Sequence, residues 1–285
     1  MFDRVVMVDW SATNHAVRSP KKDSLWLAWQ DAAGAQIQTL HLPTRRAVER
    51  RLLELCAEVR GRILLGFDFA FGYPAKARLP TGRKLCSFLA ARLSEDEAGH
   101  SNRFDVAAAL NRRLRSRAGG SGPFWGLPKG RAVKGLRAKP SQHVLPEFRW
   151  VDQRCREHVG RHGALPQSAW KLFGNGSVGS QSITGLACIG RLLDQTEFGR
   201  RAKLWPFETR WDRMVPPGAI IIAEVWPAVV RHGWRSLSGI KDKSQVRALV
   251  KAAVAGELTL GRPQGLSPQQ ERIARTAEGW ILGVP

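Results

Sequence analysis

Three short apolar runs in this sequence each end in an acidic residue, and this pattern restricts the fold more than any other feature. The runs are VVMVD, ILLGFD and IIIAE, which end at Asp9, Asp68 and Glu224. Consecutive apolar residues of this kind are typical of central strands that are covered on both faces of a sheet. The sequence therefore predicts a sheet flanked by helices, with an acid at the end of each of three strands.

The segments around these runs complete an α/β pattern. Residues 24–30 and 36–42 read as strands that form an antiparallel meander with the first run. Residues 44–60 place apolar side chains at helical spacing, which indicates a crossover helix before the second run. Further helices are predicted over 240–256 and after Ser267, which has the chemistry of an N-cap. Three antiparallel strands, a crossover helix and parallel strands open an RNase H-like mixed sheet, although several other mixed sheets begin in the same way.

The composition adds a strong charge imbalance. Lys and Arg number 45 against 24 Asp and Glu, which gives a formal net charge of +21. A positive field of this size attracts polyanions, so nucleic acid is the expected partner. Base-composition bias in the encoding genome is the alternative source of so many arginines. With 285 residues, of which 43% are hydrophobic, we expect a single RNase H-like domain over residues 1–285.

The spacing of the cysteines and the length of the apolar segments predict the cellular compartment. The four cysteines are widely scattered and form no C-x-x-C pair, so neither a disulfide framework nor a zinc site is indicated. The first residues contain an apolar run that is too short for a secretion signal, and no later run approaches the length of a membrane span. We therefore expect a soluble cytoplasmic protein that makes no use of a membrane.

A basic segment interrupts the α/β pattern. Residues 106–146 contain no acid and show no periodic apolar pattern, so residues 100–165 are predicted to be a basic, partly flexible insertion before the strand at 219–224. The cations proposed to bind nucleic acid are Arg112, Arg113, Arg115, Arg117, Lys129, Arg131, Lys134, Arg137 and Lys139. Two interpretations stay open. The segment is either an arm that contacts nucleic acid, with Phe124 and Trp125 stacking on bases, or a solvated linker that the same aromatic residues anchor.

The three strand-end acids have a chemical use if they converge. Open α/β sheets bind ligands beyond the carboxyl ends of their strands, where acids distant in sequence meet. Converging carboxylates raise one another's pKa unless a cation lies between them. One or two Mg²⁺ or Mn²⁺ ions suit such oxygen ligands, and would activate water and stabilise the leaving oxygen in phosphodiester hydrolysis. The alternative is that each acid caps a turn or pairs with a local arginine.

An ordered set of motifs resembles a known family. The motifs are VVMVDWSA, LLGFDFAFGYP, NRFD, SVGSQSITG, IIIAEVWPA, IKDKSQVRAL and EGWILG, and they cover essentially the whole chain. This set is similar to a family of uncharacterised proteins identified as predicted nucleases with an RNase H-like, RuvC-like core. The resemblance implies that Asp9, Asp68 and Glu224 occupy the acidic positions of that core. Relatives of the fold that cut branched junctions are dimers, so a dimer is one possible state.

The chain departs from this superfamily at the last helix. Its nucleases usually carry a further Asp there, whereas this helix offers Glu278 or alternatively Glu271, and Asp242 at the start of the preceding helix is the rival. The resemblance thus implies that Asp9 bridges the metal ions, that Asp68 and Glu224 complete the shell, and that Glu278 or Asp242 holds a second ion. The extra methylene of Glu shifts its carboxylate, so the second metal position is where the prediction is weakest.

A glycine-rich loop follows the insertion. GNGSVG over 174–179 matches the dinucleotide pattern G-x-G-x-x-G, but no clear strand precedes it. We interpret it as a loop whose backbone amides approach a phosphate or the metal site, with Ser177, Ser180 and Gln181 as polar contacts. A simple turn before a helix is the alternative.

Three function classes compete on these grounds. The leading hypothesis is a metal-dependent nuclease that grips phosphates through the basic insertion. The second is a small-molecule phosphotransferase or ATPase of the related actin-like fold, but the glycine that its phosphate turn needs after the first acid is replaced by Trp10. The third is a nucleic-acid-binding protein without catalytic activity, in which the metal site has decayed.

Overall fold

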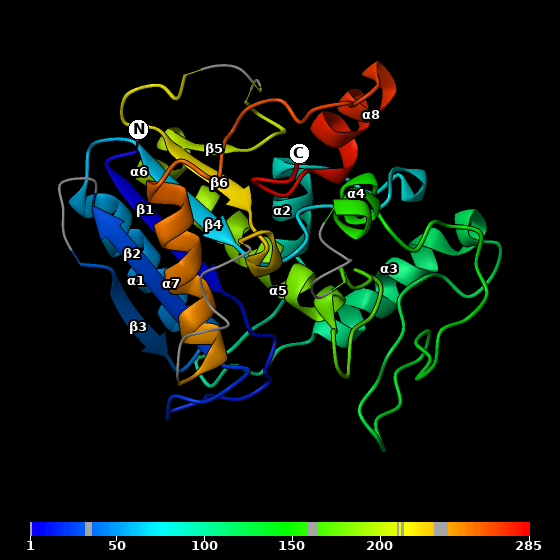
Figure 1. Cartoon of the computed structure of the whole chain (residues 1–285). Coiled ribbons are helices and arrows are strands. Elements are labelled where there is room, and N and C mark those ends of the chain that lie inside the picture. The colour runs from blue at the N-terminus through cyan, green and yellow to red at the C-terminus, as the bar shows by residue number, and fades with distance from the viewer. Residues whose placement is uncertain (1, 32–35, 159–164, 210, 212–213, 231–238) are drawn as a thin grey trace.

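A mixed sheet of six strands forms the centre of the protein, with helices on both of its faces (Figure 1). The structure is a computed structural model, and it describes residues 2–31, 36–158, 165–209, 211, 214–230 and 239–285. The strands are β1 (Arg4–Asp9), β2 (Leu25–Asp31), β3 (Gln38–Leu42), β4 (Ile63–Phe67), β5 (Ala202–Leu204) and β6 (Ile220–Glu224). Their order across the sheet is β3-β2-β1-β4-β6-β5.

One half of the sheet is antiparallel and the other half is parallel. β2 pairs antiparallel with both β1 and β3, whereas β4 runs parallel to β1 and β6 runs parallel to β4 and β5. This confirms the mixed sheet that the apolar runs and the meander predict. β5 was not predicted, because its three residues are too few to show a periodic pattern.

Helices cover the two faces of the sheet. They are α1 (Arg45–Glu58), α2 (Arg83–Ala90), α3 (Arg103–Ala118), α4 (Trp150–His158), α5 (Val178–Leu193), α6 (Thr196–Arg201), α7 (Lys241–Val254) and α8 (Pro268–Ile273). Of the predicted helix starts, Thr44 caps α1 by accepting from the Ala47 amide, and Ser267 forms a capping box at α8. Among the described residues, no helix combines the length and the apolar character that crossing a bilayer requires.

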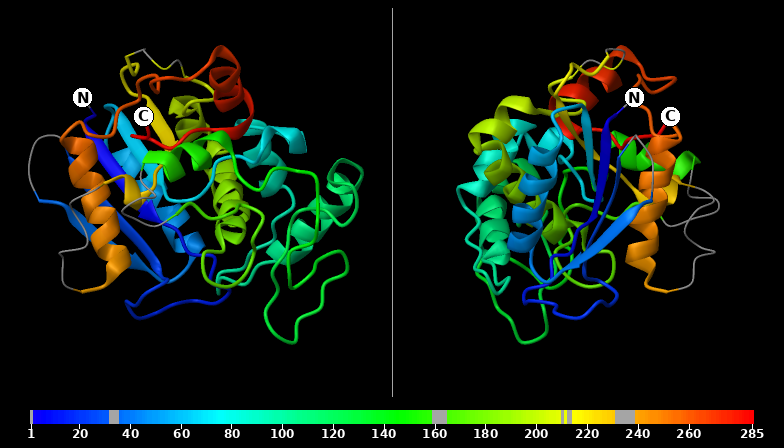
Figure 2. Two further views of the ribbon diagram at one scale, coloured as in Figure 1. Left: turned by 45° about the vertical axis from the view of Figure 1, so that its right-hand side comes forward. Right: turned by 90° about the vertical axis from the view of Figure 1, so that its left-hand side faces the viewer.

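Side-chain alternation along the central strands produces two separate cores. Val8 and Phe67 belong to the core on the side of α1, α2 and α5, whereas Met7 and Leu64 belong to the core on the side of α7. Figure 2 shows α7 lying on the opposite face of the sheet from α1 and α5. Residues that are adjacent in a strand therefore face different helices.

The first part of the predicted insertion is helical. Residues 103–118 form α3, where the sequence predicted no regular structure. The buried positions Phe104, Ala107, Leu110 and Leu114 recur at helical spacing, so α3 packs on the core although arginines occupy its outer face. Residues 159–164 of the predicted insertion lie outside the described part of the chain.

Candidate active site

Asp9 and Asp68 lie side by side where two parallel strands end. Asp9 is the last residue of β1 and Asp68 directly follows β4, whose register places Val8 opposite Phe67. The Trp10 amide donates to Oδ1 of Asp68 at 2.7 Å, which joins the two strand ends. Asp9 follows Met7 by two residues on its strand, so both belong to the face that α7 covers.

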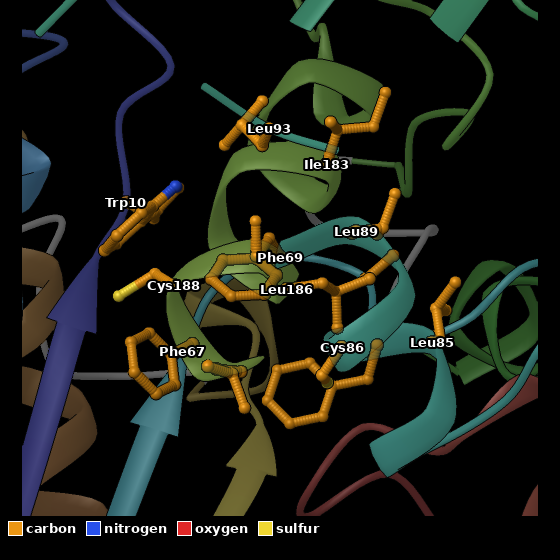
Figure 3. Close-up of a cluster of buried hydrophobic side chains, with 14 of the residues drawn as sticks. Trp10, Phe67, Phe69, Leu85, Cys86, Leu89, Leu93, Ile183, Leu186 and Cys188 are labelled. Atoms are coloured by element: carbon orange, nitrogen blue, oxygen red, sulfur yellow. The ribbon is translucent and has the colours of Figure 1, made fainter. Parts of the chain in front are cut away.

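The aromatic residues next to these acids anchor the strand ends. Trp10, Phe67 and Phe69 pack in the core on the opposite face, against α2 and α5 (Figure 3). The Trp10 indole meets the Phe67 and Phe69 rings edge-on at centroid distances of 6.0 and 5.8 Å. It also donates from Nε1 to Oγ1 of Thr184 on α5 at 3.0 Å. This packing holds the backbone that carries Asp9 and Asp68.

A third carboxylate comes from α7, the helix that covers the same face of the sheet as Asp9. Asp242 lies in the first turn of α7 and is buried, and its Oδ2 accepts a hydrogen bond from the Asp23 amide at 2.6 Å. The charge of Asp242 acts on both Asp9 and Asp68, raising the pKa of each. The structure thus brings Asp9, Asp68 and Asp242 together, and we call these three residues the acid cluster.

The acid cluster carries an electrostatic cost. Burial raises the pKa of Asp9 well above its usual range, and the charges of Asp68 and Asp242 raise it further, more than Lys241 lowers it. Burial also raises the pKa values of Asp68 and Asp242, while backbone amides that donate to these carboxylates lower them. Carboxylates in this state are stabilised by a proton or by a bound cation.

Glu224 has a different environment although its strand adjoins β4. It pairs with Phe67 across the sheet, and Ile222, two residues earlier, belongs to the core on the side of α5. Arg149 donates to both carboxylate oxygens of Glu224 at 2.7 Å, and the Phe71 amide donates to Oε2 at 2.9 Å. Burial raises the pKa of Glu224, and Arg149 opposes that shift.

Arg149 is the centre of a buried ion-pair group. Its guanidinium also binds Asp152 through Nε and Nη2, and its side chain is 2% exposed. Glu278 lies beside this group: its carboxylate accepts from the amides of Ala75 and Trp150 at 2.8 and 2.7 Å, and its carbonyl accepts from Arg149. Glu224 and Glu278 are therefore engaged with Arg149 and the start of α4. We call Arg149, Asp152 and Glu224 the arginine triad.

The acid cluster and the arginine triad adjoin one another. A small cavity of about 50 Å³ is lined by Asp68 on one side and by Arg149, Asp152 and Glu224 on the other. Sequence reasoning missed Arg149, because a single arginine in the segment FRW carries no signal that distinguishes it from the other 44 basic residues.

The acid cluster has the donor chemistry that a hard divalent metal requires. Within the described ranges, no group of three or more His, Cys, Asp or Glu side chains is arranged so that it could hold a metal ion. Mg²⁺ is commonly held by one or two carboxylates, with water and substrate phosphate as the other ligands. Asp9 and Asp68 offer two such carboxylates, with Asp242 beside them, and a cation bound there would reduce the repulsion that raises the pKa of Asp9.

The glycine-rich loop borders a larger cavity next to the acid cluster. Ser177, Ser180 and Gln181, the predicted polar contacts, all line this cavity of about 610 Å³. Gln181 donates from Nε2 to the carbonyl of Trp10, so the start of α5 is tied to the end of β1. Ser180 donates to the carbonyl of Leu172, which lies in the loop before α5. We call this space the loop cavity.

The predicted nucleic-acid-binding cations are all exposed, and they do not all line the same cavity. Arg131 lines the loop cavity, and Arg113 lies over the Phe88 ring at 5.5 Å. A second cavity, of about 370 Å³, is lined by four others. These four are Arg112, Arg115, Lys134 and Arg137. The structure gives Arg117, Lys129 and Lys139 surface positions outside both cavities.

The aromatic residues of the basic segment have separate environments. Phe124 is 2% exposed and packs against Tyr73 and Trp170, with centroid distances of 5.5 and 4.9 Å. It anchors the segment and is not free to stack on a base. Trp125 is partly buried, and the ammonium of Lys171 lies 5.5 Å from its ring.

Comparison of the chain with protein-family models, with curated proteins and with solved structures found no match. Its function is therefore inferred from the chemistry of these residues.

Proposed function

We propose that this protein is a metal-dependent nuclease with an RNase H-like fold, which hydrolyses phosphodiester bonds of nucleic acid. The observation that carries the proposal is the acid cluster, in which buried Asp9 and Asp242 and partly buried Asp68 lie at the ends of β1 and β4 and the start of α7. The sheet supports the fold assignment, because an antiparallel β1–β3 meander precedes a crossover helix and a parallel β4 beside β1.

Asp9 and Asp68 are the residues proposed to hold Mg²⁺ or Mn²⁺, with Asp242 beside them as a further acid. When bound, such an ion supplies a water with a lowered pKa and stabilises charge on the phosphate oxygens. The protein itself positions the carboxylates: the Trp10 amide holds Asp68, and the Asp23 amide holds Asp242. Asp242 takes the place that the family resemblance assigns to an acid on the last helix. Glu224 then supports the site through Arg149 and is not a ligand.

The distribution of charge supports a nucleic-acid substrate. The chain carries +21, and arginines of the basic segment line the loop cavity and the neighbouring 370 Å³ cavity. Such cations bind phosphates with little sequence preference and with strong salt dependence. The four free cysteines, all buried, agree with activity in a reducing compartment such as the cytoplasm.

The test is cleavage of labelled single-stranded, duplex, hybrid and branched nucleic acids in Mn²⁺ or Mg²⁺. We expect the wild type to cut at least one substrate and Asp9→Asn, Asp68→Asn and Asp242→Asn to lose at least about a hundredfold in rate, as loss of a charge-stabilising group does. Asp96→Asn is the matched control, because Asp96 is an exposed acid that pairs with His100. Equal activity of the cluster variants and the wild type, or failure to cut any substrate, would refute the proposal.

A further inference from the structure

The loop cavity contains a buried arginine that no carboxylate pairs with in the described part of the chain. Arg103, the first residue of α3, is 6% exposed. It donates from Nε to Oγ of Ser180 at 3.1 Å and from Nη1 to the side chains of Asn14 and Ser101. All three acceptors are neutral. Burial and the charges of Arg45 and Arg131 lower the pKa of Arg103 to about 10.

A second arginine lies on the same aromatic ring. The guanidinium carbons of Arg103 and Arg131 are each 4.6 Å from the centroid of the Phe104 ring. Arg131 is exposed, and among the described residues it too has no carboxylate partner. Attraction to the ring holds both cations in place, but it leaves their mutual repulsion in force. An anion bound between them would remove that repulsion.

The remaining walls of the loop cavity also suit an anion. Residues 174–177 form one wall and lead into the first turn of α5, a helix of 16 residues whose N-terminal end favours negative charge. Asn14 and Gln181 add polar side chains. Asp23 is the one carboxylate among the described lining residues, and its amide binds Asp242 of the acid cluster. The cavity therefore adjoins the acid cluster through Asp23, although Asp9, Asp68 and Asp242 do not line it, and it reaches the arginine pair.

We infer that the loop cavity binds one nucleotide of the substrate strand, with its phosphate held by Arg103 and Arg131. This inference rests on the proposed function and names the residues that place the strand beside the acid cluster. Guanidinium groups match the geometry of phosphate oxygens, and a volume of about 610 Å³ is within the range of nucleotide-sized sites. Phe173 lines the same cavity and is 44% exposed, so its ring is available for a base to stack on.

The experiment measures binding of adenosine 5′-monophosphate by calorimetry in the presence of a chelator, with inorganic phosphate and adenosine as comparison probes. We expect the monophosphate to bind more tightly than either comparison probe, because it uses both the arginine pair and the Phe173 ring. Arg131→Ala should weaken this binding at least about tenfold, in line with the loss of a charged hydrogen bond. Arg103→Lys, which keeps the charge but loses the planar donor geometry, should weaken it as well.

Arg92→Ala is the matched control. Arg92 is also an exposed arginine stacked on a phenylalanine, 3.8 Å from the Phe88 ring, but it does not line the loop cavity. The Arg92→Ala variant should bind adenosine 5′-monophosphate as tightly as the wild type does. Equal binding by Arg131→Ala and Arg92→Ala, or binding of the monophosphate no tighter than that of adenosine, would overturn the inference.

The Asp68→Asn variant separates this inference from the proposed function. It should lose cleavage and keep monophosphate binding, because Asp68 lies outside the loop cavity. Binding that depends on Arg131 in a protein that cuts no substrate would retain the phosphate site and reject the nuclease. If cleavage depends on Asp68 but Arg131→Ala leaves monophosphate binding unchanged, the nuclease proposal stands and the phosphate site at Arg103 and Arg131 is rejected.

Discussion

Replacing Glu224 with glutamine distinguishes a metal ligand from a member of the arginine triad. Glutamine keeps the size of the side chain and one oxygen acceptor, but it removes the charge that faces Arg149. It also places an amide donor where Oε1 or Oε2 now accepts from a guanidinium N–H. Two charge-assisted hydrogen bonds at 2.7 Å are thereby weakened or lost in a fully buried setting. We therefore expect the fold itself to lose stability.

The size of the stability loss depends on the contacts of Arg149 that the substitution leaves intact. Breaking a buried ion pair by removing one partner costs about 3–5 kcal/mol. Arg149 keeps its two hydrogen bonds to Asp152, so its charge is still partly compensated. We therefore expect the free energy of unfolding to fall by an amount at the lower end of this range, ~3 kcal/mol. With a urea m-value of about 3 kcal/mol/M for a chain of this size, the unfolding midpoint should fall by about 1 M.

The assay is urea unfolding followed by tryptophan fluorescence in metal-free buffer, with Asp68→Asn as the comparison. Asn at position 68 keeps an oxygen for the Trp10 amide and removes a charge that burial disfavours, so its midpoint should equal or exceed that of the wild type. At urea concentrations well below its unfolding midpoint, where it is folded, Glu224→Gln should still cleave nucleic acid. If Glu224→Gln unfolds at the wild-type midpoint yet has lost cleavage, Glu224 is a ligand and our assignment of the triad is wrong.

Two further predictions concern the acid cluster and its support. Because burial and neighbouring charges raise the pKa of Asp9, the fold loses stability as pH rises from the ordinary pKa of an aspartate to that raised pKa, and the loss is complete above it. In the presence of a chelator, Asp9→Asn should therefore be more stable than the wild type at about pH 8, and this stability difference should shrink toward about pH 5. If the urea midpoints of the two proteins differ by the same amount across this pH range, the prediction is wrong. Gly185→Ala places a Cβ 2.2 Å from Cε1 of Phe69 and should cost about 1–3 kcal/mol and reduce cleavage, because Phe69 adjoins Asp68. Gly261→Ala, whose nearest atom is 3.8 Å away, is its control, and equal thermal midpoints for the two variants would rule out the packing argument.

The sequence predicted the central strands because their apolar runs are continuous. Burial on both faces requires such runs, so β1, β4 and β6 and the acids at their ends were visible from residue type alone. The partners of those acids were not visible. Glu224 ends its run as Asp9 does, yet the register sets it level with Phe67, whose side chain faces the core on the side of α5. Register between distant strands depends on packing that no local pattern records.

Two features had a local signal that the sequence interpretation did not use: the position of Asp242, which it left as the alternative to Glu278, and the helix α3. Asp242 precedes Val246 by four residues, so helical spacing places it on the buried face of α7, which favours it over Glu278 as the third acid. In α3, the run of Ala and Leu residues in FDVAAALNRRL is typical of a helix, but the dense arginines drew the interpretation toward an irregular arm. Arg103, by contrast, gains its importance only from burial against Ser180 and Asn14, which are distant in sequence.

The partners of the buried acids elsewhere in the molecule support a functional role for the acid cluster. Glu95, which is buried like Asp9, forms ion pairs with Arg45 and Arg191, and Glu224 is held by Arg149. Arginine is thus the partner of several buried carboxylates, whereas backbone amides donate to the carboxylate of buried Glu278. In the acid cluster, Lys241 opposes the raised pKa of Asp9, but burial and the neighbouring carboxylates outweigh it. The acid cluster keeps this repulsion where two strands and a helix meet, and in the proposed nuclease a divalent cation with its phosphate ligand would relieve it.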